Sequence, residues 1–84
     1  MRDSHAFTAQ KIIAALHTER KRRGWSQETL AVAAGLSDSC IRHLENQRAT
    51  PTLVTLLKLA SALDLDLAEL LRTAMKEGEK RLKR

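Results

Sequence analysis

The chain has 84 residues, a single cysteine and a formal net charge of +5. Most of this charge lies toward the two ends of the chain, a pattern that favours binding to an anionic polymer or a membrane surface. The alternative is that the charge serves only solubility, as it does in most small basic domains. The length allows one small domain without a separate sensor domain, and no apolar run reaches the roughly 18–20 residues of a membrane span. The lone Cys40 cannot form an internal disulfide and no signal-peptide pattern is present, so we expect a cytoplasmic protein.

Apolar residues recur at helical spacing through most of the chain, and no segment alternates in the manner of a strand. A first helix is predicted over residues 9–23, ending before Gly24. The preceding residues 1–8 are expected to form an N-terminal arm. The inner face of the first helix carries Ile12, Ile13 and Leu16.

Two short helices separated by a glycine are predicted next. Ser26 is a suitable N-cap for the second helix, Gly35 ends it, and Ser37 caps the third. Because glycine adopts a left-handed conformation without a Cβ clash, the third helix can cross the second. The expected shape is a helix-turn-helix, whose protruding helix fits the roughly 12 Å wide major groove of DNA. The expected inner faces carry Leu30, Ala31, Ala34, Ile41 and Leu44.

Two more helices complete the predicted fold, an all-α compact five-helix bundle. Thr52 caps the fourth helix, and Asp66 with Glu69 forms a capping box for the fifth. The helical domain is expected over residues 9–75, followed by a basic charged tail over residues 76–84 that either extends the last helix or is disordered. The inner face of the fourth helix is expected to be Leu53, Leu56, Leu57, Ala60 and Leu63.

The series of motifs from about Leu16 to Leu71 resembles a known family. The stretches GWSQETLA, AGLS, CIRHLEN, RATPTLVTLLKLASAL and LAELL follow one another as in the DNA-binding domain of the phage Cro and repressor type, also called the xenobiotic-response-element (XRE) family. In length and helix count the chain is also similar to controller proteins of restriction–modification systems. The resemblance implies a phage-repressor-type fold and a sequence-specific transcriptional regulator that binds double-stranded DNA as a homodimer on a pseudo-palindromic operator.

The resemblance assigns DNA contacts to the second and third helices. Gln27 is expected to bind a phosphate together with the helix N-terminus. Arg42 can span guanine O6 and N7, with a phosphate clamp as its rival role. His43 is expected to donate to guanine or to a phosphate unless it is merely solvated, and Ser39 suits either a base or the backbone.

The two ends of the third helix carry the remaining expected contacts. Ser37 and Asp38 start it, and Asp38 either accepts from cytosine N4 or, the favoured alternative, caps its own helix. After it, Asn46 and Arg48 are placed at the DNA backbone, with Arg48 on a phosphate. The family usually has glycine where this chain has Gln47, so Asn46 is expected to take the left-handed conformation instead.

A basic run ends the first helix, and the resemblance separates its first member from the others. Arg20 is expected to form an internal salt bridge with Glu28 or Glu45. The residues that follow, Lys21 to Arg23, are solvated and can add non-specific attraction to DNA. Trp25 is expected to cover the entry to the second helix as a core residue.

A single short helix reads only a few base pairs, so two copies are expected to pair on the operator. The fifth helix supplies the candidate dimer interface. Its apolar side chains exceed what one small core needs, although they can instead seal the core of the monomer. They are Leu67, Leu70, Leu71 and Met75.

The alternative function is an antitoxin of a toxin–antitoxin pair that autoregulates its operon, with a toxin as an additional partner. An enzyme is not expected, because nothing orients His43 for a triad with Ser37 and Asp38. The histidines and Cys40 lack metal-ligand spacing. We therefore expect no catalytic residue, metal, cofactor, small-molecule ligand or membrane partner.

Overall fold

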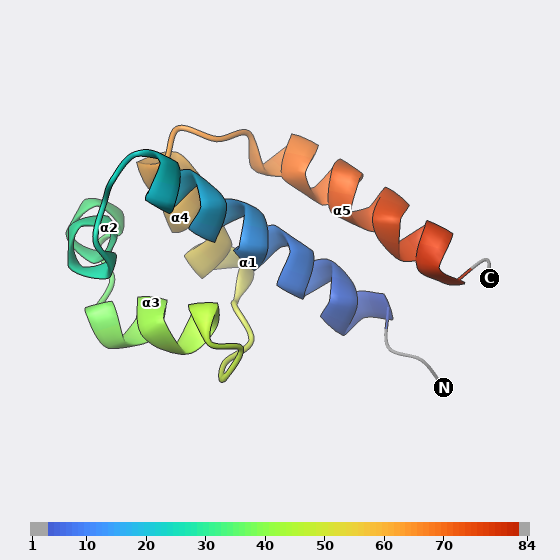
Figure 1. The fold of residues 1–84 in the computed structure, drawn as a ribbon, viewed down its shortest axis with the longest axis horizontal. Helices are drawn as coiled ribbons and strands as arrows, with labels where there is room; N and C mark the ends of the chain where they lie inside the picture. Colours follow the sequence, from blue (N-terminus) through green and yellow to red (C-terminus); the bar gives the residue numbers. More distant parts are fainter. Residues whose placement is uncertain (1–3, 83–84) are drawn as a thin grey trace.

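The computed structural model of the chain describes residues 4–82, and over this range it contains five helices and no strand. The helices are α1 (Ser4–Arg22), α2 (Gln27–Ala34), α3 (Asp38–Glu45), α4 (Leu53–Ala62) and α5 (Leu67–Leu82). Figure 1 shows α1 and α5 side by side, α4 behind α1, and α2 with α3 at one end of the molecule. The predicted all-α five-helix fold is confirmed. None of the helices in this range is both long and apolar enough to span a bilayer.

The helices begin at the predicted caps. In each case a side-chain oxygen accepts a backbone N–H from two or three residues further along, at 3.0–3.1 Å, and each such cap stabilises its helix by about 1 kcal/mol. Glu69 was predicted to complete a capping box but accepts instead from Arg72 Nη2 at 2.8 Å. The capping residues are Ser26, Ser37, Thr52 and Asp66.

The first four helices end in the same hydrogen-bond motif. A residue in the left-handed conformation follows each helix, and the next N–H donates to the carbonyl five positions back, at 2.7–3.1 Å. The prediction for Asn46 is wrong, because its φ is −90° and the left-handed residue is Gln47 at φ 60°. The motif fixes the left-handed position relative to the last helical turn, whatever residue stands there. The four residues that occupy it are Gly24, Gly35, Gln47 and Asp64.

The core takes one face from every helix. The predicted inner faces of the first three helices are confirmed, and Trp25 is half-buried against the edge of the core. On α4 the prediction is partly wrong, because Leu53 and Leu57 are exposed while Leu59 is buried. The buried apolar residues are Ile12, Ile13, Leu16, Leu30, Ala31, Ala34, Ile41, Leu44, Leu56, Leu59, Ala60, Leu63, Leu67 and Ala74.

The first and last helices are longer than predicted and pack against each other more extensively than any other pair. Helix α1 begins at Ser4, so residues 4–8 of the predicted arm are helical. Helix α5 continues through the buried Gly78 to Leu82, so most of the predicted tail extends the helix. Lys11 Nζ and Glu77 Oε1, 3.0 Å apart, join the two helices. The division into arm, domain and tail stays a prediction, and helices run across both of its boundaries.

Candidate nucleic-acid interface

Helix α3 has one apolar and one polar side. Ile41 and Leu44 are buried and hold the helix against the core, and Gly35, at φ 72°, lets α3 cross α2. Figure 1 shows α3 along the edge of the molecule, at the far end from the termini. The structure thus brings the predicted base-reading residues together on one accessible side. They are Asp38, Arg42 and His43, which are exposed, and Ser39, which is half-buried.

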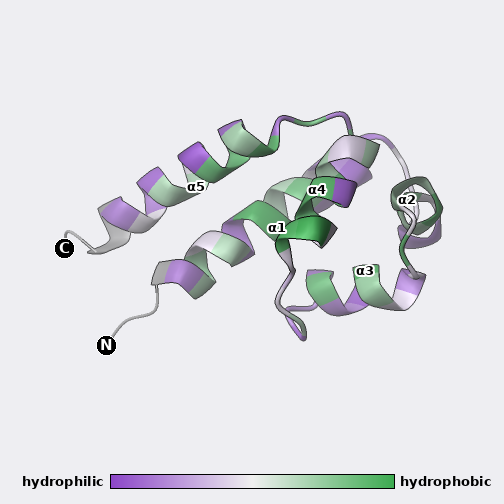
Figure 2. Cartoon of the chain, turned by 180° about the vertical axis from the view of Figure 1, so that it is seen from behind, coloured by the Kyte–Doolittle hydropathy of each residue, from purple (hydrophilic) through white to green (hydrophobic). Residues whose placement is uncertain are grey.

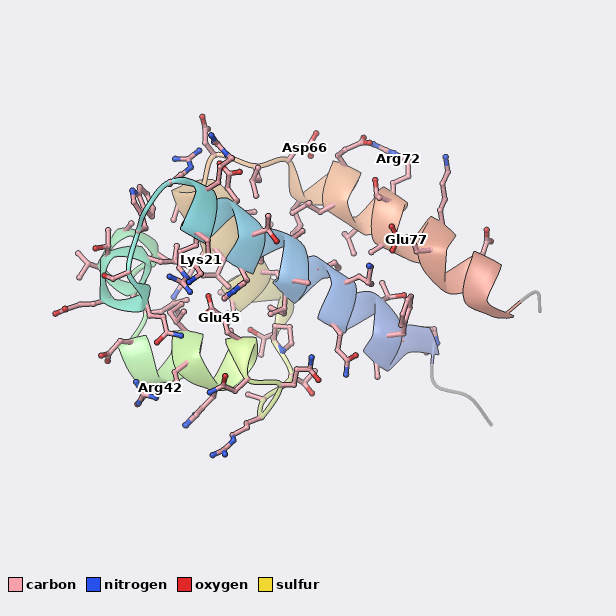
Figure 3. All side chains as sticks on the ribbon, viewed as in Figure 1. Lys21, Arg42, Glu45, Asp66, Arg72 and Glu77 are labelled. Atoms are coloured by element: carbon pink, nitrogen blue, oxygen red, sulfur yellow. The ribbon has the colours of Figure 1, made fainter. Side chains whose placement is uncertain are left out.

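Arg42 is the most prominent group on this side. It projects from α3 away from the other helices (Figure 3), and its Nη2 donates to Ser39 Oγ at 2.9 Å. Because one hydrogen bond leaves the other guanidinium N–H groups free to donate, Arg42 retains the capacity for a bidentate contact with guanine. Among the side chains that the structure describes, that of Asp38 has no hydrogen-bond or ion-pair partner. Its predicted capping role is wrong, because Ser37 Oγ alone accepts the Cys40 N–H.

The side chain of Gln27, at the start of α2, is oriented by a hydrogen bond to Glu45. Its Nε2 donates to Glu45 Oε1 at 2.9 Å, which joins the first residue of α2 to the last residue of α3. A side-chain amide carries two N–H groups, so the second remains available to a phosphate. The role of Glu45 in orienting Gln27 was not predicted, since nothing in the spacing of residues 18 apart indicates such a contact.

Glu45 is the centre of a buried polar cluster beneath the candidate interface. Arg20 Nε and Nη2 donate to its two carboxylate oxygens at 2.8 and 3.0 Å, and both side chains are only 7% exposed. Arg20 Nη1 also donates to the Trp25 carbonyl at 2.7 Å, and His17 Nδ1 lies 3.0 Å from Glu45 Oε1. Figure 3 shows Glu45 between α3 and α1. The predicted internal salt bridge of Arg20 is confirmed, with Glu45 as the partner.

The cluster also sets the ionisation of Glu45. Burial alone would raise its pKa, but the hydrogen bonds from Arg20, Gln27 and His17 outweigh burial and hold the pKa below the ordinary value of 4.5. The carboxylate is therefore charged under physiological conditions. A charged Glu45 lets one side chain fix Arg20 on α1 and Gln27 on α2 at the same time.

The free energy of unfolding is expected to fall as the pH drops below about 4.5. The unfolded chain then binds a proton at Glu45 before the folded chain does, so acid favours unfolding. Urea titrations at a series of pH values measure how steeply the free energy of unfolding falls with decreasing pH. In a Glu45→Gln variant this fall should be shallower. The difference between the two proteins isolates Glu45 from other carboxylates. Equal slopes would contradict this assignment.

The basic run at the end of α1 is largely engaged within the protein. Glu19 accepts from Arg22 Nε at 2.9 Å and from Arg23 Nε at 2.8 Å, and these hydrogen bonds lower the pKa of Glu19 to about 2. Arg23 Nη2 also donates to the Leu63 carbonyl at 2.7 Å, and its guanidinium lies 5.4 Å from the centre of the Trp25 ring. Only Lys21 of the run forms no ion pair within the described part of the chain. The run therefore offers DNA less free charge than its sequence indicates.

The loop after α3 carries the last predicted contacts. Asn46 and Arg48 are both exposed, and the Arg48 N–H donates to the His43 carbonyl at 2.7 Å. Beside this loop lies an open groove of about 510 Å³, and its lining includes the buried Ile13 and Leu44 and the exposed Arg48. The position of Arg48 next to α3 is compatible with the predicted phosphate contact.

Cys40 and the histidines were expected to bind no metal and to take part in no catalysis. Cys40 is a free, half-buried thiol that packs against the core. Among residues 4–82, no three histidine, cysteine, aspartate or glutamate side chains are grouped to hold a metal ion.

Comparisons with known proteins agree with this geometry. Residues 16–70 match the family model described as helix-turn-helix. A curated relative, the HTH-type transcriptional regulator SutR of Escherichia coli (strain K12), is 39% identical over 46 residues, which cover 55% of this chain and 26% of that regulator. The match thus spans about a quarter of that regulator's length.

Two solved structures share the fold. The hypothetical transcription factor NHTF from Neisseria has a TM-score of 0.69 and 30% identity, over 82% of this chain and 76% of that one. The restriction-modification controller protein C.AhdI from Aeromonas hydrophila has a TM-score of 0.64 and 35% identity, over 81% of this chain and 98% of that one.

Proposed function

We propose a function from one premise: this chain belongs to the helix-turn-helix family of transcriptional regulators, whose fold binds DNA. Within that family we assign it the role of a cytoplasmic, sequence-specific regulator that binds double-stranded DNA as a homodimer on a pseudo-palindromic operator. The observation that supports this role most directly is the exposed polar side of α3, held outward by the buried Ile41 and Leu44.

The contacts divide into two kinds. Arg42, Ser39 and His43 reach the base edges from α3, and Arg42 supplies the most specific contact. Gln27 and Arg48 bind phosphates on either side of that helix and set its position in the groove. Because one helix reads only a few base pairs, a pair of α3 helices about 34 Å apart supplies the specificity that a genome requires.

Replacing Arg42 with alanine is expected to weaken binding to the selected operator by about 1–3 kcal/mol and to relax the preference at one base position. Selection of bound duplexes from a random pool provides the operator and its symmetry. Titrations of that operator and of single-base variants then measure the loss. Gln27→Ala should weaken all duplexes to a similar extent, because a phosphate contact carries no sequence information.

Arg72→Ala is the matched control, since Arg72 is also an exposed arginine but stands on α5. It should leave operator affinity and base preference unchanged. If Arg42→Ala weakens every duplex equally, Arg42 clamps a phosphate and the base-reading assignment is wrong. If the wild-type protein selects no duplex from the pool, the proposed function itself is wrong.

A further inference from the structure

Helix α4 exposes a row of large aliphatic side chains. Leu53 is 63% exposed, Val54 59% and Leu57 50%, and they lie on the side away from the buried Leu56 and Leu59. We call these three residues the α4 stripe. Figure 2, in which α4 is seen from its outer side, shows hydrophobic colour along most of this helix. The largest apolar patch on the surface of a protein is often a functional one.

Helix α5, which was predicted to form the dimer interface, packs most of its apolar side chains against the core of its own monomer. Helix α5 packs along α1, Leu67 and Ala74 are buried, and Leu70 and Leu71 are partly buried against the core. Of the four residues predicted for that interface, only Met75, at 59% exposure, is largely free of the monomer. The apolar surface of α5 thus seals the core, and the larger unpaired apolar surface is on α4.

We propose that the α4 stripe is the homodimer contact, and that its occupant is the same stripe of a second copy. This inference rests on the proposed function, which requires two copies on one operator. A twofold interface places the same patch on both sides, and an aliphatic row is complementary to itself.

Charge favours a second copy at this surface. The chain carries a net charge of +5, so two copies repel each other overall. Residues 49–63 contain a single charged side chain, Lys58, and pairing through α4 therefore brings the fewest like charges together.

The area is also appropriate for the centre of an interface. From their exposed fractions, the three side chains offer roughly 300 Å² per copy, comparable to the largest apolar patch of a typical monomer. A standard interface buries about 800 Å² per partner, with an apolar centre and a polar rim. The exposed Lys58 and Ser61 on the same helix fit such a rim.

The position of the stripe agrees with the geometry that an operator requires. Leu53 and Val54 begin α4, directly after the loop that leaves the C-terminal end of α3 (Figure 1). A twofold axis through the stripe brings the C-terminal ends of the two α3 helices toward each other. The polar sides of these helices take no part in the contact and remain free for DNA.

The test compares two aspartate substitutions at positions of equal exposure, Val54→Asp on α4 and Met75→Asp on α5, both 59% exposed in the wild type. Light scattering after size exclusion separates a protomer of 9.4 kDa from a species of twice that mass. We expect a wild-type dimer, a Val54→Asp monomer and a Met75→Asp dimer. Circular dichroism shows whether Val54→Asp is folded. If it is not, Leu57→Gln serves as a milder variant of the α4 stripe and should raise the dimer dissociation constant at least tenfold.

Three outcomes would overturn the proposal: a Val54→Asp protein that remains dimeric, a Met75→Asp protein that becomes monomeric, or a wild type that is monomeric at all concentrations tested. Binding of folded Val54→Asp to a duplex with one half-site shows whether α3 recognises DNA independently of the dimer. It therefore distinguishes a wrong interface from a wrong proposed function. If half-site binding persists while the interface is disproved, DNA recognition by α3 stands without this dimer.

Discussion

Replacing Glu45 with alanine is expected to lower the free energy of unfolding by about 3–5 kcal/mol, because it leaves Arg20 buried without its counter-charge. The same substitution removes the acceptor of Gln27 Nε2, so the side chain proposed to bind a phosphate at the start of α2 loses its orientation. The variant should therefore be less stable and should also bind DNA more weakly. Urea denaturation and operator titration measure the two effects.

A double variant separates stability from binding. Arg20→Met combined with Glu45→Leu replaces the ion pair with apolar groups of similar size, a change that is often neutral or stabilising. We expect it to recover most of the lost stability but not the DNA affinity, since Gln27 remains unanchored. Full recovery of both would show that Glu45 acts only through the stability of the fold.

Replacing Ile41 with alanine is expected to cost about 2–5 kcal/mol of unfolding free energy, since Ile41 is almost fully buried and anchors the middle of α3. The cavity beneath the helix should also loosen the orientation of Arg42, the next residue along the chain. Operator affinity should fall even at temperatures where the variant is fully folded.

Ile41→Val is the matched control, because it removes one methylene group and should cost only about 0.5–1.5 kcal/mol with little loss of operator affinity. Thermal unfolding ranks the three proteins, and DNA titration well below the lowest melting temperature isolates the effect on binding. If Ile41→Ala binds the operator as well as the wild type does, α3 does not depend on this anchor for its orientation.

Local signals were sufficient to predict the architecture. Capping side chains at Ser26, Ser37 and Thr52 and the turn at Gly35 act within a few residues of where they stand, so sequence alone placed α2, α3 and α4. The outward side of α3 was also predictable, because Ile41 and Leu44 are the only large apolar residues on that helix.

Predictions that depended on tertiary packing were less successful. Helix α4 contains leucines around more of its circumference than one face can hold, and its docking against α2 decided that Leu59 is buried and Leu57 is not. On α5 the decisive partner was α1, which lies far away in the sequence. The contact between Gln27 and Glu45 likewise exists only after α2 and α3 have crossed.

The pairing of α1 with α5 has a consequence for synthesis on the ribosome. The ion pair between Lys11 and Glu77 joins segments that emerge roughly 3–13 seconds apart at about 5–20 residues per second. During that interval the apolar side of α1 has no α5 to cover it, and from residue 45 onward the whole helix-turn-helix has also been translated. Helix α3 packs against α2 and α1, so the helix-turn-helix can take shape before the last helix arrives, while the nascent chain still exposes the apolar side of α1 that α5 will cover.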